Sequence, residues 1–115
     1  MMRVALTQAA DGVLRVCCTG TVGIGTESTA SMQPVSQAIH DWMHEHRGET
    51  VREIEVDFRD VDYRWGDAPV ACFVPFLRDG VQQFRFLAGA SSGPALESLF
   101  AAVRMPWFSV QRLDE

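Results

Sequence analysis

The sequence has few cysteines, no excess of positive charge and no long apolar run, and these absences exclude several classes of protein. Its net charge is -5 at pH 7, so it lacks the basic footprint of a nucleic-acid-binding domain. No apolar run is long enough to cross a bilayer, and the N-terminal stretch is too short and interrupted for a signal peptide. We therefore expect a cytoplasmic protein that neither binds nucleic acid nor inserts into a membrane.

The cysteines and histidines form no recognisable framework. Cys17 and Cys18 are neighbours in a predicted strand, so their side chains point to opposite faces, and Cys72 lies in a predicted helix. His40 and His44 are one helical turn apart, which is metal-ligand spacing, but no third ligand is identifiable nearby. We therefore predict reduced thiols, solvated histidines and no metal site.

The length and hydrophobic content of the chain suffice for one domain with a single core. The chain has 115 residues, of which 47% are hydrophobic, and we expect residues 1–115 to form a single domain. Arg3–Gln8 and Val13–Thr19 read as two strands joined at Asp11-Gly12, a strong hairpin signal. The glycines of residues 20–26 lack the lysine or the complete spacing of a nucleotide loop, so this segment reads as a strand exit.

Apolar side chains at helical spacing predict three helices. The first has Pro34 in its first turn, ends at Arg47-Gly48, and could be capped by one of four hydroxyl residues. The second is kinked or shortened at Pro75, and the third begins at Ser92-Gly93-Pro94 and stops before Pro106. Their buried stripes are, in order, Val35, Ile39, Trp42 and Met43; Val70, Phe73, Val74 and Leu77; and Leu96, Leu99, Phe100 and Val103. The candidate caps are Thr26, Ser28, Thr29 and Ser31.

Alternation between residues 54 and 59 predicts a central strand. Ile54, Val56 and Phe58 share one side, which faces a core, while charged residues take the other side and face a polar layer. Further strands are expected at Gln83–Ala88 and Trp107–Leu113. Strands thus alternate with helices after the first hairpin, which predicts an α/β fold with a mostly parallel sheet and right-handed crossovers.

A polar turn follows the central strand, at the edge where open α/β sheets place their binding surfaces. Trp65 in this turn is either a binding hot spot or a cover for the sheet edge. Asp67 is expected to cap the next helix with its carboxylate. The carboxylates of the turn lack EF-hand spacing, so no cation site is predicted. The charged residues of the turn are Asp60, Asp62, Arg64 and Asp67.

Two stretches resemble STAS domains, the sulfate transporter and anti-sigma factor antagonist family. EIEVDFRDVDYRWGDAPVACFVPFL is similar to the central strand, turn and helix of that family, and FRFLAGASSGPALESLF to its next strand and Pro-initiated helix. The resemblance implies a STAS-like α/β domain with a central, mixed, mostly parallel sheet, an N-terminal antiparallel hairpin and about three packed helices.

The chain departs from that family at its signature. Trp65-Gly66-Asp67-Ala68 stands where the family has Asp-Ser-Ser-Gly, whose second serine is phosphorylated by a partner kinase in the bacterial antagonists. Asp67 occupies that serine's position. It either supplies a permanent negative charge, roughly as a phosphoserine would, or acts only as a helix cap.

The resemblance implies a non-catalytic, regulatory protein-interaction module that binds a kinase-like, transporter-like or signalling protein. The alternative is a small-molecule or lipid-sensing, transport-associated domain, which predicts a ligand-sized pocket near Cys72 and Phe76. An enzyme is the least supported class, because the sequence shows no nucleophile with a general base at a recognisable spacing. No cofactor is expected. A homodimer is an open alternative. The expected partner-binding residues are Asp62, Tyr63, Arg64, Trp65, Gly66 and Asp67.

Overall fold

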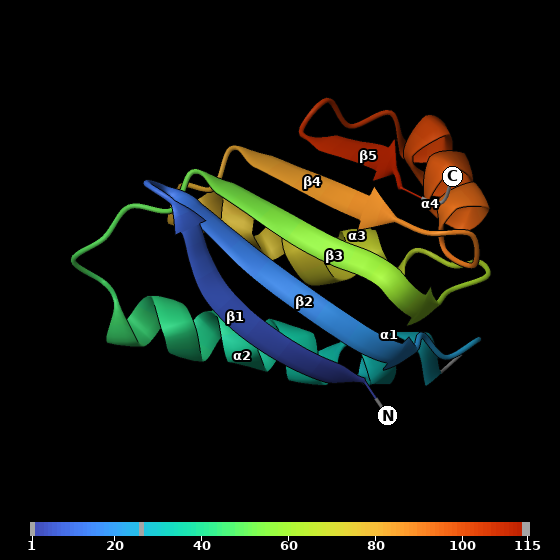
Figure 1. Ribbon diagram of the computed structural model, residues 1–115, viewed down its shortest axis with the longest axis horizontal. Coiled ribbons are helices and arrows are strands. Elements are labelled where there is room, and N and C mark those ends of the chain that lie inside the picture. The colour runs from blue at the N-terminus through green and yellow to red at the C-terminus, as the bar shows by residue number, and fades with distance from the viewer. Residues whose placement is uncertain (1, 26, 114–115) are drawn as a thin grey trace.

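The computed structural model describes residues 2–25 and 27–113 and contains one five-stranded sheet (Figure 1). The strands lie in sequence order, and β1 is antiparallel to β2 whereas β2, β3, β4 and β5 are parallel. Their bounds are Arg3–Ala10, Val13–Thr21, Glu53–Asp62, Gln83–Ala88 and Phe108–Arg112. The antiparallel hairpin and the parallel crossovers predicted from the sequence are confirmed.

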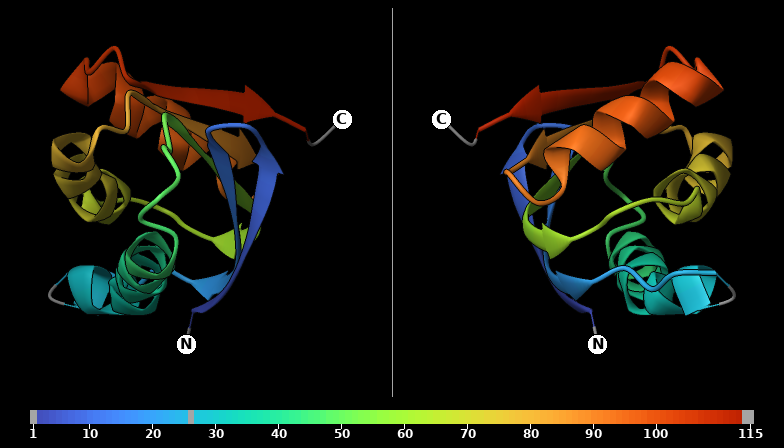
Figure 2. Two further views of the ribbon diagram at one scale, coloured as in Figure 1. Left: turned by 90° about the vertical axis from the view of Figure 1, so that its left-hand side faces the viewer. Right: turned by 90° about the vertical axis from the view of Figure 1, so that its right-hand side faces the viewer.

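The helices pack on one side of this sheet, as Figure 2 shows for α2, α3 and α4. They are α1 (Glu27–Ser31), α2 (Gln33–Glu45), α3 (Ala68–Phe73), which continues into the 3-10 helix η1 (Val74–Asp79), and α4 (Gly93–Val103). The described residues therefore form four α-helices where about three were expected, because the short α1 precedes α2. None of these helices is both long and apolar enough to cross a membrane.

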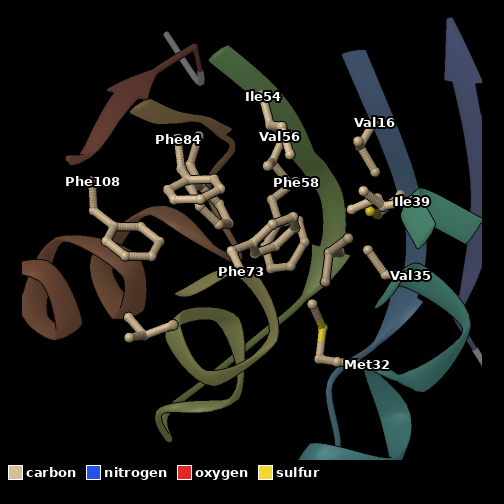
Figure 3. Close-up of a cluster of buried hydrophobic side chains, with 14 of the residues drawn as sticks. Val16, Met32, Val35, Ile39, Ile54, Val56, Phe58, Phe73, Phe84 and Phe108 are labelled. Atoms are coloured by element: carbon tan, nitrogen blue, oxygen red, sulfur yellow. The ribbon is translucent and has the colours of Figure 1, made fainter. Parts of the chain in front are cut away.

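The core lies between the sheet and the helices (Figure 3). Alternate residues of the three inner strands point into it and are fully buried, as the alternation in β3 predicts. Each such side chain contributes about 1.5–3 kcal/mol on burial. Phe86 is at the centre, since its ring contacts those of four other phenylalanines. The inward residues of these strands are Leu14, Val16, Ile54, Val56, Phe58, Phe84 and Phe86.

The start of α2 corrects the predicted cap. The residue at the N-cap position is Met32, and no side chain caps the helix. Two of the candidate hydroxyl residues serve α1 and the preceding loop instead. Ser28 Oγ donates to the Gly25 carbonyl at 2.9 Å, and Ser31 Oγ donates to the Ser28 carbonyl at 2.6 Å and accepts from the Gly23 N–H at 2.9 Å. Thr26 lies outside the described residues. The helix also ends at Glu45, earlier than the predicted stop at Arg47-Gly48.

Pro75 shortens the second predicted helix. It has no N–H to donate to the preceding turn, so α3 gives way to the tighter η1 after Phe73. A 3-10 helix repeats every three residues, which brings Phe76 beneath Phe73 into the core and leaves Leu77 only partly buried. The predicted stripe is therefore right as far as Phe73 and shifted after it.

The opposite face of the sheet carries a polar layer made by the chain itself. Glu55, on the side of β3 expected to face a polar layer, is only 4% exposed. Strand register places Arg15 and Arg85 on either side of it. Arg15 Nε donates to Glu55 Oε2, and Arg85 Nη2 donates to Oε1 at 2.5 Å. The two guanidinium groups thus bury this carboxylate without leaving it unpaired.

Candidate functional site

The polar turn predicted as the site, residues 62–67, lies where β2, β3 and β4 all end; we call it the β3–α3 corner. Figure 2 (right) shows it passing between α4 and the connection from β2 to α1. Hydrogen bonds join the end of β3 to both neighbouring connections: the Val22 N–H donates to the Asp62 carbonyl at 3.0 Å, and the Ser91 hydroxyl donates to the Val61 carbonyl at 3.0 Å. The corner is therefore held from two sides.

Tyr63 anchors the corner from inside. Its side chain was expected in the exposed turn, but the residue is only 1% exposed, and its hydroxyl donates to the Gly66 carbonyl. Its ring meets Phe58 edge to face, with centroids 6.4 Å apart. Gly66 has φ +112°, a conformation that favours glycine. The tyrosine thus positions the other corner residues from inside, and it is not itself available at the surface.

The protonation of Tyr63 gives a direct measure of this anchor. Burial, with a smaller effect of the Asp67 carboxylate, raises the pKa of Tyr63 to about 12. The folded state therefore keeps its proton above the ordinary tyrosine pKa of about 10, and stability is lost as the pH rises from about 10 through 12. Tyr63 is the only tyrosine, so absorbance at 295 nm reports it alone. We expect a midpoint near 12 while near-ultraviolet circular dichroism stays native; a midpoint near 10 in the folded protein would contradict the buried anchor.

Trp65 points away from the core. It is 60% exposed, so the interpretation in which it folds back to cover the sheet edge is wrong. Arg64, next to it, forms an ion pair with Asp62 at 3.4 Å between exposed groups, which contributes little to stability. Asp67 is also exposed. The corner therefore presents an indole, a guanidinium group and carboxylates to solvent.

Asp67 occupies the predicted N-cap position of α3 but does not use its carboxylate there. Its backbone carbonyl accepts from the Ala71 N–H at 2.9 Å, whereas its side chain makes no capping hydrogen bond. Two features explain the difference. The backbone at Asp67, with φ -99° and ψ 6°, lies outside the extended region typical of a cap, and Pro69 removes one of the N–H groups that a cap would satisfy. The carboxylate is thus left at the surface.

A buried serine that supports the corner was not singled out from the sequence. Ser92, expected only as a helix start, donates its hydroxyl to the Phe58 carbonyl at 2.8 Å and accepts from the Gly89 N–H at 3.2 Å. A Cβ on Gly89 would lie 2.7 Å from the Arg59 carbonyl oxygen, so this approach needs a glycine. The signal in the sequence was Gly89-x-Ser-Ser92 directly after β4. This spacing places a glycine and a hydroxyl beside the neighbouring strand, β3.

An apolar groove adjoins the corner. It has a volume of about 270 Å³ and lies between the Trp65 turn and α4. Its lining residues are Tyr63, Arg64, Trp65, Gly66, Ala95, Ser98, Leu99 and Ala102. The hollow beside Cys72, where a ligand-sized pocket was expected, has only about 120 Å³, below the 300–1,000 Å³ usual for ligand sites, and Phe76 is fully buried.

The other candidate ligands lie away from the corner. His40 and His44 line an open hollow of about 340 Å³ at the C-terminal end of α2. All three cysteines are free, and burial raises the pKa of the Cys18 thiol and that of Cys72, the latter to about 12. Within residues 2–25 and 27–113, no group of three or more His, Cys, Asp or Glu side chains is placed to hold a metal ion.

Comparison with known proteins identifies the architecture. No family model matches the sequence, and no curated protein matches it either. Among solved structures, the anti-sigma factor antagonist SpoIIAA in its unphosphorylated form superimposes with a TM-score of 0.65 over 95% of this chain and 88% of that one, at 12% sequence identity. The chain has the STAS fold. The resemblance inferred from the central strand, turn and helix is thus confirmed for the fold. At 12% sequence identity, the comparison shows the fold alone.

Proposed function

We propose that this STAS-fold chain is a non-catalytic regulatory module that binds a protein partner through the β3–α3 corner. The observation that carries the proposal is Trp65, 60% exposed on a turn that the rest of the chain holds in place. Tryptophan is among the residues most enriched in binding hot spots, and a preorganised turn loses little entropy on binding. A large indole left in solvent on such a turn is best explained by a partner that covers it.

The carboxylate of Asp67 supports the same proposal. Because it makes no capping hydrogen bond, a structural role as a cap does not account for it. The similar structure, SpoIIAA, is an anti-sigma factor antagonist solved in an unphosphorylated form. Asp67 stands where STAS antagonists carry their phosphorylated serine, so we propose that it presents a constant negative charge to the partner. That partner is a kinase-like, transporter-like or signalling protein.

The chemistry around the corner favours binding over catalysis. The hydroxyls of Ser91 and Ser92 donate to backbone carbonyls of β3, so neither is poised as a nucleophile. The histidines could serve as bases, but they lie on α2 and just after it. A hollow that they line also includes Val51 and Asp79, which precede β3 and β4, at the other end of the sheet from the corner.

Replacing Trp65 by alanine tests the proposal. We expect the affinity for the partner to fall by about 30-fold or more, as for a hot-spot residue. The free energy of unfolding should change by less than about 1 kcal/mol, because the indole is largely in solvent. The partner is first captured from the host with immobilised wild-type protein, and its affinity for purified variants is then measured by calorimetry.

A matched variant separates the corner from a general loss of tryptophan. Trp42→Phe changes a half-buried residue on α2 and should leave affinity unchanged. Asp67→Ala should weaken binding without unfolding the chain, since no capping bond is lost. Wild-type affinity in Trp65→Ala would refute the corner as an interface, and equal affinity of the wild type, Asp67→Ser and Asp67→Ala would refute a role for the charge.

A further inference from the structure

The groove beside the corner has one wall that the fold leaves without a partner. Ala95, Ser98 and Ala102 are spaced by three and four residues, so they form one stripe along α4. Leu99 lies beside them and is half-buried, whereas Leu96 on the inner side is fully buried in the core. The outer stripe of α4 therefore has only small side chains, which allow another helix to approach closely.

The opposite wall supplies a large apolar surface. Trp65 and Gly66 line the same groove as the α4 stripe, and the groove's volume of about 270 Å³ leaves room for a side chain between the indole and the helix. An exposed helix face, a concave apolar floor over Leu99 and an exposed tryptophan thus meet in one place. Each of these features alone would be unremarkable, but together they form a shaped surface for an apolar ridge.

The charge around the groove favours a partner segment that is positively charged. The exposed Asp67 directly follows the groove-lining Gly66, and Arg64, the cation among the lining residues, is paired with Asp62. The Asp67 carboxylate makes no capping hydrogen bond, so it is available to a basic group of the partner. The whole chain also carries a net charge of -5. The rim is complementary to lysine or arginine.

We propose, building on the proposed function, that this groove receives an amphipathic helix of the partner protein. Its apolar stripe places one or two large side chains between Trp65 and α4, and a flanking basic residue faces Asp67. Helix-in-groove binding of this kind is recognised by anchors at i, i+3, i+4 and i+7. The chemistry thus assigned to the partner is a helix that is apolar on one side and positively charged on its flanks.

A pair of synthetic peptides tests this assignment. The probe is a helical peptide with leucines at i, i+3, i+4 and i+7 and lysines on both flanks; the control replaces every lysine with glutamate. We expect the lysine peptide to bind at least tenfold more tightly and to shift the backbone amide resonances of residues 63–66 and 95–102. The protein has no lysine, so a carbodiimide should couple peptide lysines to Asp67 without joining protein side chains to each other.

Two arginine substitutions make the result specific. Ala102→Arg places a cation and a long side chain in the groove at an exposed position, and we expect it to weaken binding of the lysine peptide and of the captured partner by tenfold or more. Ser109→Arg adds the same charge at an exposed position on β5 and should leave both affinities unchanged.

The outcomes separate the proposal of a helix-binding groove from the proposal that the β3–α3 corner is an interface. Resonance shifts elsewhere on the surface, equal binding of both peptides, or wild-type partner affinity in Ala102→Arg would overturn the groove. If Trp65→Ala still abolished partner binding in that last case, the corner would stand and only the helix-binding groove would fall. If Trp65→Ala also bound normally, both proposals would fall together.

Discussion

Replacing Phe86 by alanine is expected to lower the free energy of unfolding by about 3–5 kcal/mol, the range for substitutions that remove a buried aromatic ring and leave a cavity. Phe86 is fully buried. Its ring lies 5.2–6.2 Å, centroid to centroid, from the rings of Phe58, Phe73, Phe100 and Phe108. The substitution removes all four contacts, and residues from β3, α3, α4 and β5 would have to move together to fill the space.

Urea denaturation followed by circular dichroism measures this loss. Phe100→Ala is the matched control, because its ring touches Phe86 but is only partly buried, so it should cost less. Phe86 also contacts Phe58, which in turn contacts Tyr63. We therefore expect the titration midpoint of Tyr63 in Phe86→Ala to move from about 12 toward its ordinary value. A loss below about 1 kcal/mol, with an unchanged tyrosine midpoint, would show that the core does not hold the corner.

Removing both arginines that contact Glu55 is expected to cost about 3–5 kcal/mol at pH 7, because it leaves a buried carboxylate without a partner. Glu55 is 4% exposed, and Arg15 and Arg85 contact its two oxygens. The arginines themselves are about 40% exposed at their side chains, with 45% for Arg15 and 38% for Arg85. Either single substitution should therefore cost much less than the double one, since the other guanidinium remains.

A third substitution separates the pairing from the packing of the arginine stems. Adding Glu55→Leu to the Arg15→Ala, Arg85→Ala background removes the unpaired charge and should restore most of the lost stability. Thermal and urea unfolding of the wild type, the two single variants and the double variant gives the coupling of the two arginines by a double-mutant cycle, and the triple variant is measured beside them. Equal stability of the double and triple variants would mean that the carboxylate is solvated in the absence of the arginines, so that removing them leaves no unpaired buried charge.

The features that local chemistry dictates could be predicted from particular residues. Strict alternation from Ile54 to Phe58 specified a strand, its inward face and the break that follows. Pro75 could not donate a backbone hydrogen bond, so a shortened helix was expected there and found. The strand Gln83–Ala88 was predicted with its observed bounds, because an apolar run between Gly80 and Gly89 has few other structures available.

The roles of several corner residues could not be predicted, because they depend on contacts between distant segments. Tyr63 belongs to a polar stretch, and its burial follows from Phe58 beneath it and the Gly66 carbonyl above it. Asp67 was placed correctly as the residue before α3, but whether its carboxylate caps the helix depends on local backbone angles and on Pro69. Composition and spacing carry no information about such angles.

By itself, the sequence determined the order of strands and helices, the parallel crossovers and the position of an acidic, tryptophan-bearing turn at the end of the central strand. These follow from periodicity, proline and glycine, which act within a few residues. The tertiary structure alone decided that Trp65 is left in solvent while Tyr63 is buried, that Glu55 is buried between two arginines, and that α4 forms a groove with the corner. The reason is physical: burial and pairing depend on which elements become neighbours, and the neighbouring parallel strands are far apart in the chain.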